Sequence, residues 1–155
     1  MQNRMKNHPL AEEEIDSLLE TELIGHLATV QGNQPYVVPV HFFYQDQKIY
    51  IHGLHKGQKL KNISENQNVC FEVSRFEKLI MPTDNSPCDV NTQYRSVIIK
   101  GTAKIVEEDK AKTGVLNQIV EKYTPILSGI EFGDSIKETA VIEITIKEMT
   151  GKYYP

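Results

Sequence analysis

The feature that most constrains the fold is a close succession of three strand-like segments near the start of the chain. Residues 23–30 and 34–44 are rich in β-branched, aromatic and other apolar side chains, and residues 48–51 alternate polar with apolar ones. Both patterns are typical of β-strands. Gly32-Asn33 and a short polar turn separate the three segments. Connections this short join antiparallel neighbours, so we expect a β-meander.

The rest of the chain adds more strands than helices. Further strand-like segments are residues 69–73, 94–106 and 139–149, and short helices are predicted over residues 9–20, 57–66 and 109–122. A doubly wound parallel sheet needs regular alternation of strands and helices, which is missing here. We therefore predict a mainly β fold: a small antiparallel, Greek-key-like β-barrel of about six strands with short helices.

Two segments depart from regular strand patterns. Gly101, inside the predicted strand 94–106, suggests a kink or a bulge. Residues 75–92 contain two prolines and several Asp, Asn and Ser residues, so we expect the longest irregular region there.

Composition narrows the class of protein. The 155 residues fit one domain, taken here as residues 1–155 with an N-terminal helical segment over residues 1–20. With 39% hydrophobic and 25% charged residues, the chain is not expected to be disordered. Its net charge of -4 gives no sign of the basic face that nucleic-acid binding needs. Cys70 and Cys88 lie outside any metal-binding spacing, so no metal site is predicted.

The hydropathy pattern predicts a cytoplasmic location. No apolar run approaches the roughly 20 residues of a membrane span. The polar, basic first residues are not followed by the hydrophobic core of a signal peptide. We therefore expect neither a membrane partner nor export.

The passage from the strand at residues 48–51 into the helix at residues 57–66 carries the strongest chemical signal. Two glycines, two histidines and two lysines lie around this passage. Free N–H groups and the dipole at a helix start attract anions, and Lys56 and Lys59 add full positive charges, which favours a phosphate. The stretch matches neither GxxxxGK[ST] nor GxGxxG. A turn with solvated lysines explains the same residues.

The segment 34–44 contains a second unusual position. Pro39 removes a hydrogen-bond donor in the middle of an apolar run, which points to an edge or irregular strand. His41 follows two residues later, on the same face by the period of two. Such positions are tolerated where another group approaches the backbone.

Several blocks of the sequence occur together in a familiar order. They are GHLATV (25–30), QPYVVPVHFFY (34–44), KIYIHGLHKGQKLKNISENQNVCFEV (48–73), YRSVIIKGTAKIV (94–106) and IKEMTGK (146–152). This pattern resembles the pyridoxamine 5′-phosphate oxidase-like FMN-binding split-barrel family, and most of all the branch that includes the nitroimidazole-resistance (Nim) proteins. The resemblance covers about residues 23–152.

The resemblance implies a homodimer of split barrels with FMN at the subunit interface. Residues 37–41 would line the isoalloxazine ring, the strand-to-helix segment would hold the phosphate, and the block 94–96 would come from the other subunit, with Arg95 as a planar charged donor. The implied cofactor-binding residues are Val38, Pro39, Val40, His41, His52, Gly53, Gly57, Gln58, Lys59, Tyr94, Arg95 and Ser96.

The implied function is an FMN-dependent oxidoreductase that reduces small acceptors such as nitroaromatic compounds. His52 and His41 are the candidate catalytic residues, as proton donors or substrate-orienting groups. The chain lacks the C-terminal Arg/His substrate motif of the true pyridoxamine phosphate oxidases, which argues against that reaction.

Two alternatives remain open at this point. A flavin carrier or sensor without turnover is one, because no general acid–base pair is visible. A haem- or deazaflavin-binding barrel is the other, with His26, His41, His52 and His55 as possible axial ligands.

Overall fold

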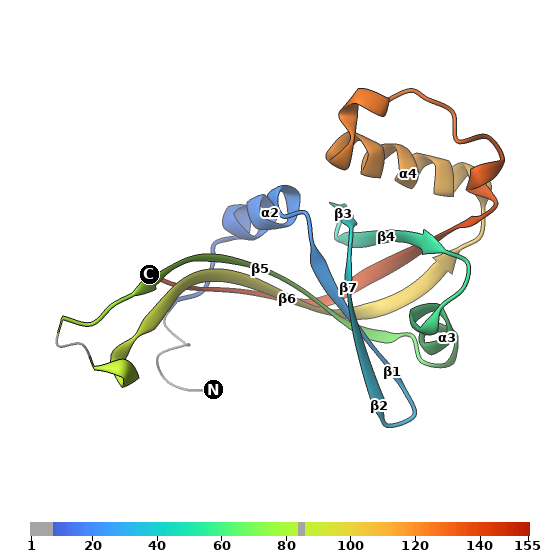
Figure 1. Ribbon diagram of the computed structural model, residues 1–155. Coiled ribbons are helices and arrows are strands. Elements are labelled where there is room, and N and C mark those ends of the chain that lie inside the picture. The colour runs from blue at the N-terminus through green and yellow to red at the C-terminus, as the bar shows by residue number, and fades with distance from the viewer. Residues whose placement is uncertain (1–7, 84–85) are drawn as a thin grey trace.

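The protein is built around one antiparallel sheet of seven strands, as a computed structural model shows for residues 8–83 and 86–155 (Figure 1). The strands are β1 (Gly25–Gln31), β2 (Gln34–Val40), β3 (Phe42–Gln45), β4 (Lys48–Leu54), β5 (Asn68–Ile80), β6 (Asn91–Val106) and β7 (Thr139–Tyr154). Their order in the sheet is β2-β1-β5-β6-β7-β4-β3. The predicted mainly β class, with short helices, is confirmed.

The two ends of the sheet belong to one segment of chain. β2 and β3 lie at opposite ends of the strand order, yet His41 alone separates them in the sequence. β2 pairs with β1 from Gly25↔Val40 onward, and β3 pairs with β4 from Phe42↔Ile51 onward. The sheet therefore curls until its ends meet, which makes a split barrel. The strand predicted over residues 34–44 is thus two strands, and the count is seven rather than six.

Strand alternation fills the barrel interior. Ile49 and Ile51 of β4 are fully buried, as is Leu27 of β1. Phe42 and Phe71 meet edge to face in the core, with ring centroids 5.1 Å apart. Apolar side chains on one face of each strand therefore supply most of the driving force for closure.

Three α-helices decorate the barrel: α2 (Glu12–Thr21), α3 (Gln58–Glu65) and α4 (Asp109–Tyr123). α2 and α4 lie on one side of the sheet in Figure 1, and α3 lies at the end of the barrel farthest from the C-terminus. Three 3₁₀ turns complete the described elements: η1 (Pro87–Asp89), η2 (Pro125–Leu127) and η3 (Gly133–Ile136). No helix in these parts of the chain is long and apolar enough to cross a membrane.

The helix ends differ from the prediction in two places. The expected helical segment over residues 1–20 begins only at Glu12; Pro9 forms an isolated bridge with Lys152, and residues 1–7 lie outside the described residues. α4 is capped by Glu108, whose carboxylate accepts a hydrogen bond from the N–H of Ala111 at 2.9 Å. Asp109, predicted as the cap, is the first helical residue.

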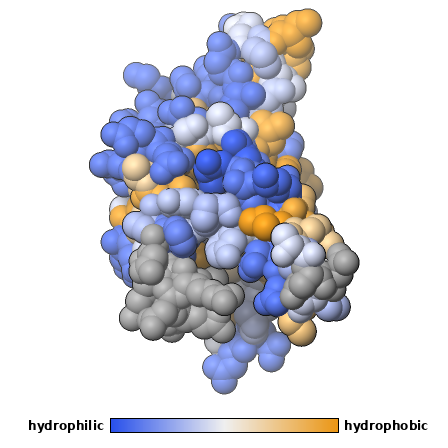
Figure 2. Space-filling view, turned by 90° about the vertical axis from the view of Figure 1, so that its left-hand side faces the viewer, coloured by the Kyte–Doolittle hydropathy of each residue, from blue (hydrophilic) through white to orange (hydrophobic). Residues whose placement is uncertain are grey.

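The predicted irregular region 75–92 was wrong at both of its ends. β5 continues to Ile80 and β6 begins at Asn91, so the two strands form a long ribbon that projects from the barrel (Figure 1). Residues 75–80 contain neither proline nor glycine, and pairing with β6 extends the strand through them. Figure 2 shows the molecule from the side toward which this ribbon points, with hydrophilic and hydrophobic side chains intermixed.

The bulge predicted at Gly101 is confirmed. The β6–β7 register shifts between Lys100 and Gly101. A Cβ atom at Gly101 would lie 2.4 Å from the carbonyl oxygen of Thr145 and 2.9 Å from the side chain of Ile144. Glycine is required here because another backbone approaches too closely for any side chain.

Replacing Gly101 with alanine should destabilise the protein by about 1–3 kcal/mol, because the clash with main-chain atoms cannot be relieved by a side-chain rotation. Gly114 is the matched control, since it lies on the exposed part of α4 and a Cβ atom added there would meet nothing within 4 Å. Gly114→Ala should stabilise the helix by about 0.5–1 kcal/mol. Urea denaturation of both variants measures the two effects, and a Gly101→Ala variant as stable as the parent would contradict the close-approach argument.

Candidate functional site

The end of β4 and the start of α3 form a corner, residues 52–59, which we call the β4–α3 corner. Ile51, immediately before the corner, is fully buried, which fixes the strand, while His52 and Gly53 emerge toward the surface. Gly57 precedes the helix with a φ of 139°, a conformation that side chains other than glycine rarely adopt. The predicted strand–turn–helix passage is confirmed, and its glycine has a conformational reason.

Lys59 folds back over Gly53. A Cβ atom at Gly53 would lie 3.1 Å from the Lys59 ammonium nitrogen, so the missing side chain gives the lysine its room. Lys59 is only partly exposed. Within residues 8–83 and 86–155, no carboxylate lies within ion-pair distance of it. A half-buried ammonium group without a counter-ion favours an anionic ligand.

α3 is held firmly but its first turn is uncapped. The buried Asn62 side chain donates to the Thr29 hydroxyl of β1 at 2.9 Å, and Gln58 donates to Asn62 at 2.6 Å. No side chain of the described residues caps the helix at Gly57. The N–H groups of the first turn therefore remain available beside Lys59, and the helix dipole adds positive potential there.

His52 is the second unsatisfied group of the corner. Its Nδ1 atom is buried and has no hydrogen-bond partner among the described residues. Burial lowers the pKa of His52, and the nearby His41 and Lys59 lower it further. The imidazole is therefore neutral near pH 7 and offers one ring nitrogen for a ligand.

His41 lies close to His52, at the break between β2 and β3. The two ring centroids are 6.2 Å apart. The His41 ring stacks on Tyr123, from the last turn of α4, at 4.4 Å. Tyr123 was missed by the sequence reasoning, because nothing in its local pattern links it to a position some eighty residues earlier.

β2 approaches this region along an open edge. Pro39 is exposed, as is Val37, whereas Val38 and Val40 are half-buried and pack against the core. The edge position predicted from Pro39 is confirmed, since β2 ends the strand order. One strand thus offers backbone and small apolar side chains next to the two histidines.

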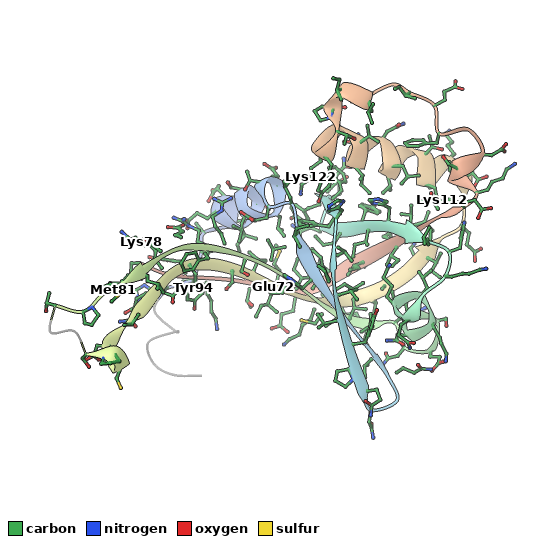
Figure 3. All side chains as sticks on the ribbon, viewed as in Figure 1. Glu72, Lys78, Met81, Tyr94, Lys112 and Lys122 are labelled. Atoms are coloured by element: carbon green, nitrogen blue, oxygen red, sulfur yellow. The ribbon has the colours of Figure 1, made fainter. Side chains whose placement is uncertain are left out.

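The block Tyr94, Arg95 and Ser96 lies elsewhere. It belongs to the ribbon, where Tyr94 pairs with Phe76, and Arg95 forms an ion pair with Glu77. Figure 3 shows Tyr94 on the ribbon, well separated from Lys122 at the end of α4. Within one chain, these three residues are therefore not brought to the β4–α3 corner.

The other two histidines of the alternative ligand set, His26 and His55, already have partners within the chain. His26 lies 3.1 Å from a carboxylate oxygen of Glu72, on β1 and β5. His55 is exposed and hydrogen-bonds the carbonyl oxygen of Lys137. Of the four histidines in that set, His41 and His52 are the pair that come together.

Comparison with known proteins places the chain in a family. A sequence model of the family described as pyridoxamine 5′-phosphate oxidase matches residues 11–153. The chain belongs to this family. A search of curated proteins found no match.

Solved structures share the family fold. A Bacteroides thetaiotaomicron protein named for 5-nitroimidazole antibiotic resistance superimposes with a TM-score of 0.81 at 24% identity, covering 94% of this chain and 86% of that one. The flavocytochrome Anf3 of Azotobacter vinelandii gives 0.82 at 24% identity, with coverages of 94% and 68%. A FAD and heme binding protein of Mycobacterium smegmatis gives 0.82 at 21% identity, with coverages of 92% and 71%. These likenesses show the split-barrel fold.

The lowered pKa of His52 predicts a pH-dependent stability. Just below the ordinary pKa of 6.5, the unfolded chain binds a proton that the folded His52 does not. The free energy of unfolding therefore decreases as the pH is lowered, by at most about 1.4 kcal/mol per pH unit. Above that value both states are neutral and the effect vanishes. In urea denaturation at about pH 7.5 and 5.5, His52→Gln should lose less stability than the parent chain. Equal losses would show that His52 is not desolvated.

Proposed function

We propose that this family member binds FMN at the β4–α3 corner and acts as a flavin-dependent oxidoreductase. The observation that carries the proposal is the meeting of Lys59, an uncapped helix start and the unpartnered Nδ1 of His52 in one corner. These groups favour a ligand that has an anionic end with hydrogen-bonding atoms near it. A flavin phosphate ester has both.

The residues of the corner fit such a cofactor. Lys59 and the first N–H groups of α3 would hold the phosphate, and Gly53 leaves room for the lysine. The ring system would lie along the exposed edge of β2, beside Pro39, with His41 and His52 at its border. A bound flavin supplies the electron transfer, while the chain binds it, orients it and excludes water.

The names of structural relatives support a flavin. They include a flavocytochrome, a FAD and heme binding protein and a FAD-binding protein from Mesorhizobium loti. The choice of FMN rests on the sequence resemblance. Haem is the alternative cofactor, with His41 and His52 as its candidate axial ligands, and the name of one of these relatives includes heme.

A homodimer would complete the site. The outer face of the sheet exposes Val37, Phe76 and Ile98, at 62%, 64% and 41% of their surfaces, and the strand register puts all three on one side. The far end of the ribbon has only two strands, which are marginally stable alone. A second copy packed on this face would cover the apolar groups and could bring its Tyr94, Arg95 and Ser96 toward the flavin.

The proposed reaction is the reduction of a small acceptor, with nitroaromatic compounds as the first candidates. His52 or His41 would donate a proton or orient the acceptor, and a cytoplasmic location is consistent with a soluble electron donor. Turnover with NADH or NADPH and a panel of acceptors distinguishes this enzyme from a flavin carrier or sensor. If replacing both histidines leaves turnover unchanged, neither acts in the reaction.

Lys59→Gln should weaken FMN binding by about tenfold to a hundredfold, because a charge-assisted hydrogen bond to the phosphate is lost. Riboflavin has the same ring system without the phosphate, so its affinity should change by less than about twofold. Quenching of flavin fluorescence measures both dissociation constants.

Lys61, two residues further along α3 and exposed, is the matched control. Lys61→Gln removes the same charge from the same helix and should leave FMN affinity near that of the parent. An equal loss of FMN and riboflavin binding in Lys59→Gln, or an equal loss in both variants, would contradict the phosphate role.

A further inference from the structure

The last turn of α4 carries an aromatic residue that touches both a side chain of the site and the backbone beside it. The Tyr123 ring stacks on His41, with centroids 4.4 Å apart and planes inclined by 24°. Its hydroxyl accepts a hydrogen bond from the N–H of Phe42 at 2.8 Å. The same oxygen lies 2.9 Å from the carbonyl oxygens of Leu23 and Phe42.

The hydroxyl replaces a missing strand partner. Phe42 is fully buried and begins β3, at the free edge of the sheet. Its N–H and C=O groups would be costly to leave unpaired. The Tyr123 hydroxyl accepts a hydrogen bond from the N–H group of Phe42 and can donate one to its C=O group. Burial raises the pKa of this hydroxyl, so it keeps the proton that it donates. The ring is thereby fixed in place.

The neighbouring lysine anchors the same helix end. The Lys122 ammonium lies 3.9 Å from the centre of the Phe42 ring and donates to the carbonyl oxygen of Leu19 at 3.0 Å. Figure 3 shows Lys122 at the end of α4, next to β3. The end of α4 is therefore tied to the barrel by two consecutive side chains.

Strand pairing does not fix the His41 side chain. It is exposed, and it lies between β2 and β3, outside the paired residues of both strands. An exposed imidazole would otherwise sample several rotamers. The stacked tyrosine selects one of them, with the ring 6.2 Å from that of His52.

We propose that Tyr123 is a positioning residue, whose ring fixes the orientation of His41 at the flavin site. The proposal rests on the proposed function, because it concerns how His41 meets the bound cofactor. It makes α4, which contributes nothing to the phosphate corner, part of the site.

NMR tests the contact without any cofactor. In the parent chain, the tyrosine ring current should shift the Cε1 proton of His41 to higher field. Tyr123→Phe keeps the ring and should keep most of the shift. Tyr123→Leu removes the ring and should abolish it. Tyr123→Gln also lacks the ring but retains polar atoms for the backbone of Phe42, so it serves if the leucine variant does not fold. A ringless variant with an unchanged His41 resonance would overturn the proposal.

A double-mutant cycle tests the functional consequence. Tyr123→Leu or Tyr123→Gln should weaken FMN binding by about twofold to tenfold, the size of one aromatic contact. In a His41→Ala background the same substitution should have almost no effect, and Tyr123→Phe should retain the affinity. Equal losses in both backgrounds would mean that Tyr123 acts only on the fold, which also overturns the proposal.

The two failures can be told apart. A parent chain that does not bind FMN refutes the proposed function, whereas the NMR comparison still decides whether Tyr123 orients His41. A parent chain that binds FMN with the predicted Lys59 dependence, but without any Tyr123–His41 coupling, refutes the positioning role alone.

Discussion

The structure depends on one constraint: a single segment, residues 34–45, forms both ends of the sheet. Its first part forms a ladder with β1 and its last part forms a ladder with β4, and the change takes place at His41. A flat sheet cannot satisfy both pairings, so the sheet must close. Closure brings the end of β4, the start of α3 and the edge of β2 into one region. Lys59, His41 and His52 belong to that region, and Tyr123 contacts it.

The site follows from what closure leaves unsatisfied. Buried polar groups in a folded protein nearly always have partners, so exceptions point to a ligand. Two buried side-chain atoms of the described residues lack a partner, Oδ1 of Asp16 on α2 and Nδ1 of His52. The second lies near the ammonium group of Lys59 and the uncapped start of α3. Several partly buried charged groups are paired within the chain, as Arg95 is with Glu77 and Glu143 is with two lysines. This contrast distinguishes a binding corner from ordinary surface charge.

Much of the fold could be predicted from the sequence, because local patterns determine it. The alternation in β4, the helix start at Gly57 and the bulge at Gly101 all depend on neighbouring residues or on the special freedom of glycine. The ends of β5 and β6 were missed because the Pro, Asp and Ser residues between them are typical of a loop. Where the strands end depends on cross-strand pairing, which a local pattern does not show. Tyr123 was missed for the same reason, since its partner Phe42 lies 81 residues away. The predicted contribution of Arg95 to the site needs a second chain and stays a prediction.

The central claim is that two chains together hold flavin at the β4–α3 corner. Native mass spectrometry of freshly purified protein, with FMN added if the protein is colourless, tests this claim most directly. We predict a complex of two 17.7 kDa chains with two FMN molecules, which are released when the protein is denatured. A single chain that takes up no FMN, or a dimer that carries haem in its place, would contradict the account.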